Sequence, residues 1–220
     1  LVRSYSLTME FVNELYNKMM QQSIIENQRQ KAELAAFKAQ ISPHFLFNTL
    51  NSLYSLVIGT SAKAENAFVK FTELLKYTYV AADNESVAIG DEIEYIRNYI
   101  DLQMIRLDGH TVVEWDCEVD RPDTQIPPMI FLTFVENAFK YGTSTSRECK
   151  IGISMRLEKG HLAFTTSNRI MRHRKEFNSD MPVGLTNCRN RLTALYPGKH
   201  SLSTGEADGK FDVVLKINLN

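Results

Sequence analysis

The chain has 220 residues, of which 44% are hydrophobic and 23% are charged. These proportions are typical of a globular protein and exclude disordered, collagen-like and low-complexity chains. The 25 lysine and arginine residues are balanced by 26 acidic residues, so there is no global basic excess that would hold nucleic acid or an anionic membrane.

A long helix is predicted at the start of the chain. Residues 7–58 contain no glycine and a single proline, Pro43, and apolar residues recur there every three or four positions. This period indicates an amphipathic helix, which we interpret as a coiled coil at its start. Gly59 ends it, and a second helix is predicted over residues 62–82. Two antiparallel helices with a short turn form a hairpin, whose apolar face needs a partner.

After a turn at residues 83–85, the pattern becomes that of a mixed α and β domain. Asp91 is predicted as the N-cap of a helix that runs to about Leu107. A strand is predicted next, and then a helix that opens at Ile126 and ends at Gly142. A polar irregular segment is predicted over 167–182 and a helix over 185–195. The predicted strands, including the one already mentioned, cover residues 111–119, 150–157, 161–166, 201–204 and 211–219.

Cysteine usage and hydropathy narrow the class of protein. Cys117, Cys149 and Cys188 are odd in number and lack CxxC spacing, which favours a reducing compartment over a disulfide framework or a zinc site. No segment has the ~18 consecutive apolar residues of a membrane-spanning helix, and no signal peptide is visible. Because the chain begins with Leu1, we interpret it as a piece of a longer protein whose membrane spans, if any, lie upstream.

The most unusual motif is Gln-Ile-Ser-Pro-His-Phe-Leu-Phe-Asn, residues 40–48. Helix positions advance by ~100°, so His44 and Asn48 share a polar stripe opposite Leu46 and Leu50. A neutral imidazole on a wet face is a usable nucleophile near neutral pH. A solvated surface histidine is the plainer alternative.

This motif resembles the phosphoacceptor region of sensor histidine kinases of the LytS/YehU type. The resemblance implies that His44 is autophosphorylated and that the helical hairpin forms a homodimer. It also implies that the phosphoryl group passes to the receiver domain of a response regulator.

A second motif, Pro-Pro-Met-Ile-Phe-Leu-Thr-Phe-Val-Glu-Asn-Ala-Phe-Lys-Tyr-Gly, covers residues 127–142. On a helix, Asn137, Lys140 and Tyr141 share a face. An Asn oxygen suits Mg²⁺, a Lys suits phosphate, a Tyr can pack on a nucleotide, and Glu136 can receive or orient a proton. Taken alone, the segment favours a plain amphipathic helix over a site. In context it resembles the N box of the ATP-binding fold, which implies ATP and Mg²⁺, with Asn137 as the metal ligand.

The third motif is Val-Gly-Leu-Thr-Asn-Cys-Arg-Asn-Arg-Leu, residues 183–192. A glycine at a helix N-terminus lets phosphate approach the backbone N–H groups closely. The motif resembles the last glycine box and following helix of the same kinases, which implies that nucleotide is bound by Gly184, Leu185, Asn187 and Arg191. For Arg191, a helix-surface pair with Asn187 is an equal alternative.

Two departures from the family pattern concern the nucleotide. Where the family has Asp-x-Gly-x-Gly, this chain has Ser-Asn-Arg-Ile-Met, so that Asn168 stands in place of the adenine-binding aspartate. An amide oxygen still accepts a hydrogen bond, but without the assistance of charge. Pro182 replaces a glycine and removes an N–H that would face phosphate. Between them lies a basic stretch over 169–175, either a solvated loop or a lid over triphosphate.

The resemblance covers roughly residues 38–219, including Tyr99, Gln103 and Arg106 before the sheet. It implies an α+β fold: an entry helix over 1–29, a dimerising phosphoacceptor hairpin over 30–84, and a two-layer α/β sandwich ATPase domain over 85–220, of the histidine kinase, gyrase, Hsp90 and MutL type. The expected function is that of an ATP-dependent protein-histidine kinase in two-component signal transduction, as the cytoplasmic part of an inner-membrane sensor. One alternative is a dimeric, non-phosphorylating signalling scaffold with a weakened ATP site. A more distant one is an ATP-driven clamp of the gyrase or MutL kind.

Overall fold

A computed structural model of the chain describes residues 14, 16, 18, 20–21, 50–55, 57–81, 84–107, 110–144, 146–171 and 183–220. The chain divides into two compact units, residues 1–56 and residues 57–220. All the described residues of the first unit are helical, as predicted. His44 and the first part of the predicted hairpin lie outside the described residues. The helices and strands from residue 62 onward all belong to the second unit.

The second predicted helix is α3 (Ala62–Ala81), and it begins after the predicted turn. Gly59 has φ of 79°, in the left-handed region that glycine adopts without steric cost. Ser61 then caps the helix, because its Oγ accepts a hydrogen bond of 3.2 Å from the Ala64 N–H. Within the second unit, α3 packs against α4 (Ile89–Arg106).

The predicted N-cap of α4 is wrong. The helix begins at Ile89 rather than after Asp91, and its N-cap Ala88 makes no side-chain capping bond. Carbonyl oxygens of a neighbouring loop replace that cap: the Ile89 N–H donates to Thr124 O at 2.9 Å, and the Gly90 N–H to Pro122 O at 3.0 Å. The strands β1 (Val87–Ala88) and β3 (Gln125–Ile126), which the sequence did not predict, pair antiparallel beside this loop.

The predicted start of the next helix, at Ile126, is also wrong. Helix α5 is Leu132–Gly142, and Ile126 belongs to β3. Pro128 disfavours the helical conformation for Pro127, and Met129 has φ of 59°, which a continuing α-helix cannot contain. The Pro-Pro-Met sequence therefore forms a turn that precedes α5.

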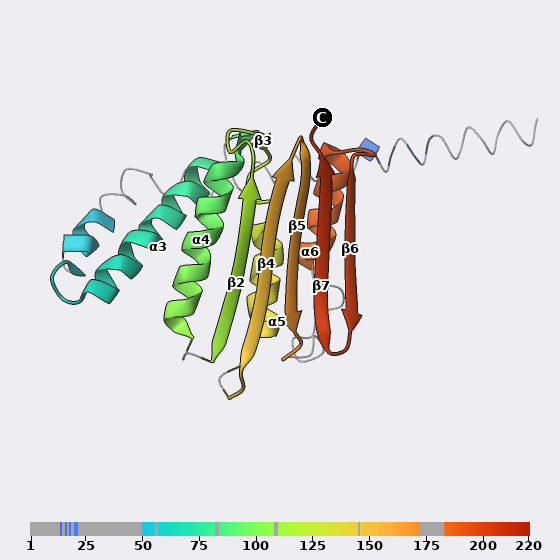
Figure 1. The fold of residues 1–220 in the computed structure, drawn as a ribbon. Coiled ribbons are helices and arrows are strands. Elements are labelled where there is room, and N and C mark those ends of the chain that lie inside the picture. Colours follow the sequence, from blue (N-terminus) through green and yellow to red (C-terminus); the bar gives the residue numbers. More distant parts are fainter. Residues whose placement is uncertain are drawn as a thin grey trace, which may run out of the picture. The chain divides into compact units, whose positions relative to one another are not determined.

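Five strands form the main sheet, in the order β2-β4-β5-β7-β6 (Figure 1). Only β2 and β4 run parallel to each other among these pairs, so the sheet is mixed. The predicted end of one strand at Thr166 is too early, because β5 continues to Arg169. Asn168 pairs with Ile151 of β4 and Phe211 of β7, and so lies in a strand rather than in an irregular segment. The strands are β2 (Thr111–Val119), β4 (Cys149–Glu158), β5 (His161–Arg169), β6 (His200–Ala207) and β7 (Lys210–Asn218).

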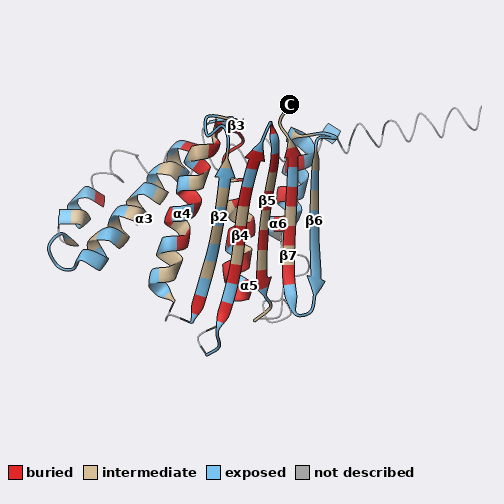
Figure 2. Ribbon diagram, in the orientation of Figure 1, coloured by how far each residue is buried: buried red, intermediate tan, exposed pale blue. Residues whose placement is uncertain are grey.

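Helices α5 and α6 (Val183–Leu195) cover one face of this sheet (Figure 1). The Phe131 and Phe134 rings pack on the Phe164 ring, with centroids 4.8 and 6.1 Å apart. Buried residues alternate with less buried ones along β4, β5 and β7, as expected for a sheet with one covered face (Figure 2). The predicted α+β class, a sheet layer with a helix layer, is confirmed.

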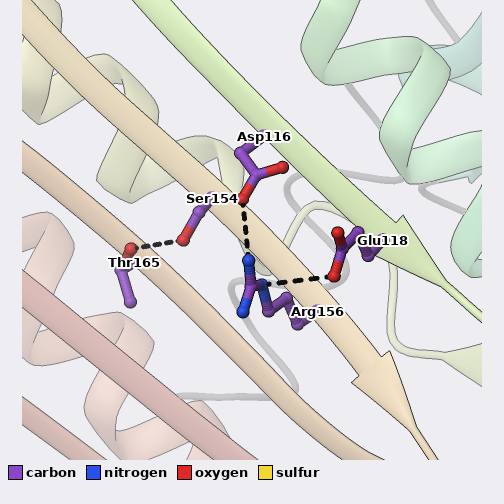
Figure 3. Close-up of polar contacts among 5 residues, drawn as sticks. All are labelled: Asp116, Glu118, Ser154, Arg156 and Thr165. Carbon is purple, nitrogen blue, oxygen red and sulfur yellow. Dashed lines mark hydrogen bonds and ion pairs between the residues drawn. The ribbon is translucent and has the colours of Figure 1, made fainter.

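The other face of the sheet carries polar side chains that pair with one another (Figure 3). The Arg156 guanidinium lies 3.2 Å from the Asp116 carboxylate and 3.5 Å from that of Glu118. Ser154 and Thr165 share a hydrogen bond of 2.7 Å across β4 and β5. This mutual pairing suits a solvated surface, and exposed ion pairs of this kind add little stability. In the part of the chain that the structure describes, no helix is both long enough and apolar enough to cross a membrane.

Candidate functional site

Helix α5 is amphipathic, and its core face determines which side chains it offers outward. Phe134, Val135 and Ala138 are buried against the sheet. Asn137, on the other side, is half-buried, and Glu136 and Lys140 are exposed. The three residues that the sequence assigned to metal, proton and phosphate therefore lie on the accessible part of the helix. The prediction that Tyr141 shares this accessible face is wrong, because Tyr141 is buried.

At the C-terminal end of α5, three predicted residues come together. Asn168 of β5 is 2% exposed, and its Cβ lies where a side chain on Gly142 would have to go, 2.7 Å from an ideal Gly142 Cβ. The Tyr141 carbonyl accepts a hydrogen bond of 2.8 Å from the Met171 N–H, just beyond β5. Gly142 is thus required for close approach of helix and strand, beyond its predicted role in ending the helix.

The Asn168 amide is oriented by its own strand. Its Nδ2 donates to the Arg169 carbonyl at 3.1 Å, whereas its buried Oδ1 has no hydrogen-bond partner among the residues that the structure describes. Buried polar atoms are nearly always paired, and an unpaired acceptor calls for an explanation. The side chain therefore presents an acceptor that fits a donor such as an amino group.

Helix α6 begins beside the first turn of α5. A Cβ on Gly184 would lie 3.2 Å from Thr133 Cγ2, a close contact that the Thr133 side chain would have to relieve by a small shift. Leu185 is buried and anchors α6 in the core, whereas Asn187 and Arg191 are exposed. Arg191 is ~10 Å further along the helix axis than Gly184. The charge of Arg191 lowers the pKa values of Glu92, Cys188 and Tyr196, in each case against a larger rise caused by burial.

A cleft of about 480 Å³ lies between α4 and α5. From α5 it is lined by Glu136 and Lys140, and from α4 by Tyr99, Gln103 and Arg106. Although Glu136 is exposed as a residue, protein atoms partly desolvate its carboxyl group and raise its pKa. Burial and the Glu136 charge raise the pKa of Tyr99 to about 12. In the sequence, these α4 residues were singled out only because they resemble the family segment before the sheet. Their spacing of four and three residues places them on one helix face, a signal that could have indicated the cleft.

Two predicted elements of the site, His44 and the basic stretch with Pro182, are not among the described residues, apart from Arg169–Met171. Among the described residues there is no group of three or more His, Cys, Asp and Glu side chains that would hold a metal. A Mg²⁺ ion bound together with phosphates needs only one or two protein oxygens, since it keeps several waters. The Asn137 amide fits that requirement.

Because the Asn168 Cβ occupies the space beside Gly142, a Gly142→Ala chain should be destabilised. The new methyl would overlap an atom that is rigidly joined to a buried strand, and such overpacking costs ~1–3 kcal/mol, more than the ~1 kcal/mol of helix propensity gained. We expect a lower urea midpoint. Gly205→Ala is the matched control, since a Cβ there meets nothing within 4 Å. Equal midpoints for Gly142→Ala and wild type would contradict the close approach.

Comparison with known proteins matches residues 32–111 to the family model for histidine kinases. The sensor histidine kinase YesM of Bacillus subtilis (strain 168) is 26% identical over 208 residues, which are 91% of this chain and 35% of YesM. The sensor protein LytS of Staphylococcus haemolyticus (strain JCSC1435) is 26% identical over 138 residues, 63% of this chain and 23% of LytS. The chain thus spans about a third of YesM and about a quarter of LytS.

Two solved structures were also similar at low sequence identity. The histidine kinase domain of the blue-light activated histidine kinase EL346 from Erythrobacter litoralis has 13% identity and a TM-score of 0.47, covering 87% of this chain and 93% of that one. The histidine kinase ThkA, crystallised in complex with the response regulator protein TrrA, has 11% identity and a TM-score of 0.42, covering 87% of this chain and 61% of that one.

Proposed function

We propose that this chain is a histidine kinase transmitter of the LytS and YesM type, and that it transfers the γ-phosphoryl group of ATP to His44. The observation that carries the nucleotide part is the buried Oδ1 of Asn168 at the end of α5, which no described residue pairs with. The exocyclic amino group of adenine would donate to this oxygen. From His44, the phosphoryl group would pass to an aspartate in the receiver domain of a response regulator.

The positions around α5 support a nucleotide that lies along this helix. Asn168 meets α5 at Gly142, and Gly184 meets it at Thr133, so Asn137 lies between the two contacts. With the base at Asn168, the phosphates would extend toward Asn137 and the N-terminus of α6, where free N–H groups favour anions. Asn137 would hold Mg²⁺, which supplies charge that neutralises phosphate oxygens. Lys140 is ~60° around the helix from Asn137, within reach of the same phosphates.

The transfer itself needs a nucleophile and a place for its proton. A nitrogen of the His44 imidazole attacks the γ-phosphorus, the bond to the β,γ-bridging oxygen breaks, and ADP leaves. The proton of the attacking imidazole goes to a base, for which we propose Glu136. Its raised pKa makes it a better proton acceptor than an ordinary carboxylate. The rest of catalysis is positioning and neutralisation of charge, as in phosphoryl transfer generally.

One observation favours the second candidate, a dimeric scaffold that does not phosphorylate. Asn168 is uncharged where the resembled kinases have an aspartate, so the hydrogen bond to adenine would be weaker. Incubation with γ-labelled ATP and Mg²⁺ separates the two candidates. A kinase takes up label that is lost in acid and kept in alkali, whereas a scaffold takes up none.

We further propose that the chain is a homodimer through its helical hairpin, and that any membrane contact belongs to segments of a longer cytoplasmic-facing sensor. On α3, Phe71 is 44% exposed, and Val69 and Val80 are exposed as well. Covering apolar surface contributes ~25 cal/mol per Å², so such side chains favour association.

Sedimentation tests the homodimer. The wild type is expected to be dimeric at micromolar concentration, and Phe71→Asp should shift it toward monomer. Val112→Asp is the control, because Val112 is 58% exposed and belongs to β2 rather than to the hairpin. A wild-type monomer at micromolar concentration would contradict the proposed dimer.

A further inference from the structure

A fully buried glutamate lies outside the groups that the proposed chemistry uses. Glu92 of α4 is 0% exposed. Its Oε1 accepts two short hydrogen bonds, one of 2.6 Å from the Tyr77 hydroxyl and one of 2.6 Å from the Met129 N–H. Within the described part of the chain, its Oε2 has no hydrogen-bond partner. A buried carboxylate with so few hydrogen-bond partners is costly, so its presence calls for a reason beyond stability.

The two donors come from different elements. Tyr77 belongs to α3, and Met129 to the turn that leads into α5. Met129 has φ of 59°, a conformation that is unfavourable for a residue with a side chain. Its N–H bond to Glu92 helps to hold that conformation. The carboxylate therefore bonds at one oxygen to both α3 and the start of the helix that carries Asn137.

Other polar contacts join α3 and α4. Asn98 donates to Glu73 at 3.1 Å, and Thr78 shares a hydrogen bond of 3.0 Å with Tyr95. The Tyr77 and Tyr95 rings pack with centroids 4.5 Å apart. The bond from Tyr77 reaches Glu92, which also bonds the turn before α5. Among the described residues, neither of these other two hydrogen bonds is linked to that turn in this way. Adjacent residues Tyr77 and Thr78 therefore provide a matched pair for a test.

We propose that Glu92 is a positioning residue that couples α3 to the helix α5, with Tyr77 holding its carboxylate against the Met129 turn. This inference rests on the proposed function insofar as α5 carries the nucleotide site. Without the Tyr77 hydroxyl, the carboxylate loses one of its two donors and turns away, and the Met129 turn loosens. Because coupling is reciprocal, nucleotide on α5 also tightens the contact of Glu92 with α3.

Hydrogen exchange without nucleotide tests the coupling directly. In Tyr77→Phe, which keeps the ring packing, amides of residues 129–135 should exchange about threefold or more faster than in wild type. Thr78→Val breaks a bond in the same interface and should leave those amides unchanged. Glu92→Gln keeps an acceptor oxygen and should stay within about twofold of wild type. Equal exchange at residues 129–135 in Tyr77→Phe and Thr78→Val would overturn the proposal.

A second measurement, the affinity for ATP, separates this inference from the proposed function. The Kd for ATP should rise about threefold to tenfold in Tyr77→Phe and stay unchanged in Thr78→Val. A wild-type chain that does not bind ATP overturns the proposed function, and the exchange of residues 129–135 then still decides the coupling. A chain that binds ATP with equal Kd in all three forms overturns the coupling to the nucleotide site.

Discussion

A His44→Gln chain is expected to take up no acid-labile, alkali-stable label from γ-labelled ATP. Glutamine is similar in size to histidine and polar, but its amide nitrogen is not nucleophilic, so the first phosphoryl transfer cannot occur. Loss of the acceptor should remove the label entirely. The measurement is filter-bound radioactivity after incubation with Mg²⁺ and ATP, with parallel acid and alkali washes.

The affinity of that variant for ATP should stay within about twofold of wild type, because the proposed nucleotide residues lie in residues 57–220 and His44 does not. His161→Gln is the matched control, since His161 is an exposed histidine at the start of β5. That variant should label as the wild type does. Label that persists in His44→Gln would remove His44 as the acceptor.

Much of the fold follows from local sequence signals. Glycines at the predicted turns have positive φ, 79° at Gly59 and 71° at Gly209, and they separate elements whose hydrophobic period is clear. The elements that were missed have no period to detect. Strands β1 and β3 contain two residues each, and their pairing joins Val87 to Ile126, far apart in the chain. The error at the start of α5 has the same origin, since Ile126 belongs to that pairing.

The candidate site divides in a similar way. Asn137 and Gly184 are predicted as site residues from motifs, and the structure places Asn137 on α5 and Gly184 on α6, beside α5. Glu92 could not have been found, because its sequence context is that of any acidic residue in the first turn of a helix. Its burial depends on Tyr77 and Met129, which are 15 and 37 residues away. The unpaired Oδ1 of Asn168 was equally hidden, because β5 continues further than its alternation predicts.

The second large effect concerns the two asparagines of the site. Asn137→Ala should eliminate Mg²⁺-dependent ATP binding, because the oxygen that would hold the ion is removed. Asn168→Asp should tighten ATP binding, because a charged acceptor replaces a neutral one. The gain is ~1 kcal/mol, or several-fold in Kd. Calorimetry on the wild type and both variants, with and without Mg²⁺, measures these effects.

The structure predicts that Asn168→Asp lowers the stability of the fold while it raises the affinity for ATP. Asn168 Nδ2 now donates to the Arg169 carbonyl, and an aspartate would place an oxygen there, against another acceptor, in a buried position. The free variant should therefore unfold at lower urea, by ~1–3 kcal/mol, while its affinity for ATP rises. Lower stability with tighter binding is expected only if the Asn168 side chain meets the nucleotide. If the wild type binds no ATP at millimolar concentration and Asn168→Asp does not restore binding, the scaffold is the correct function.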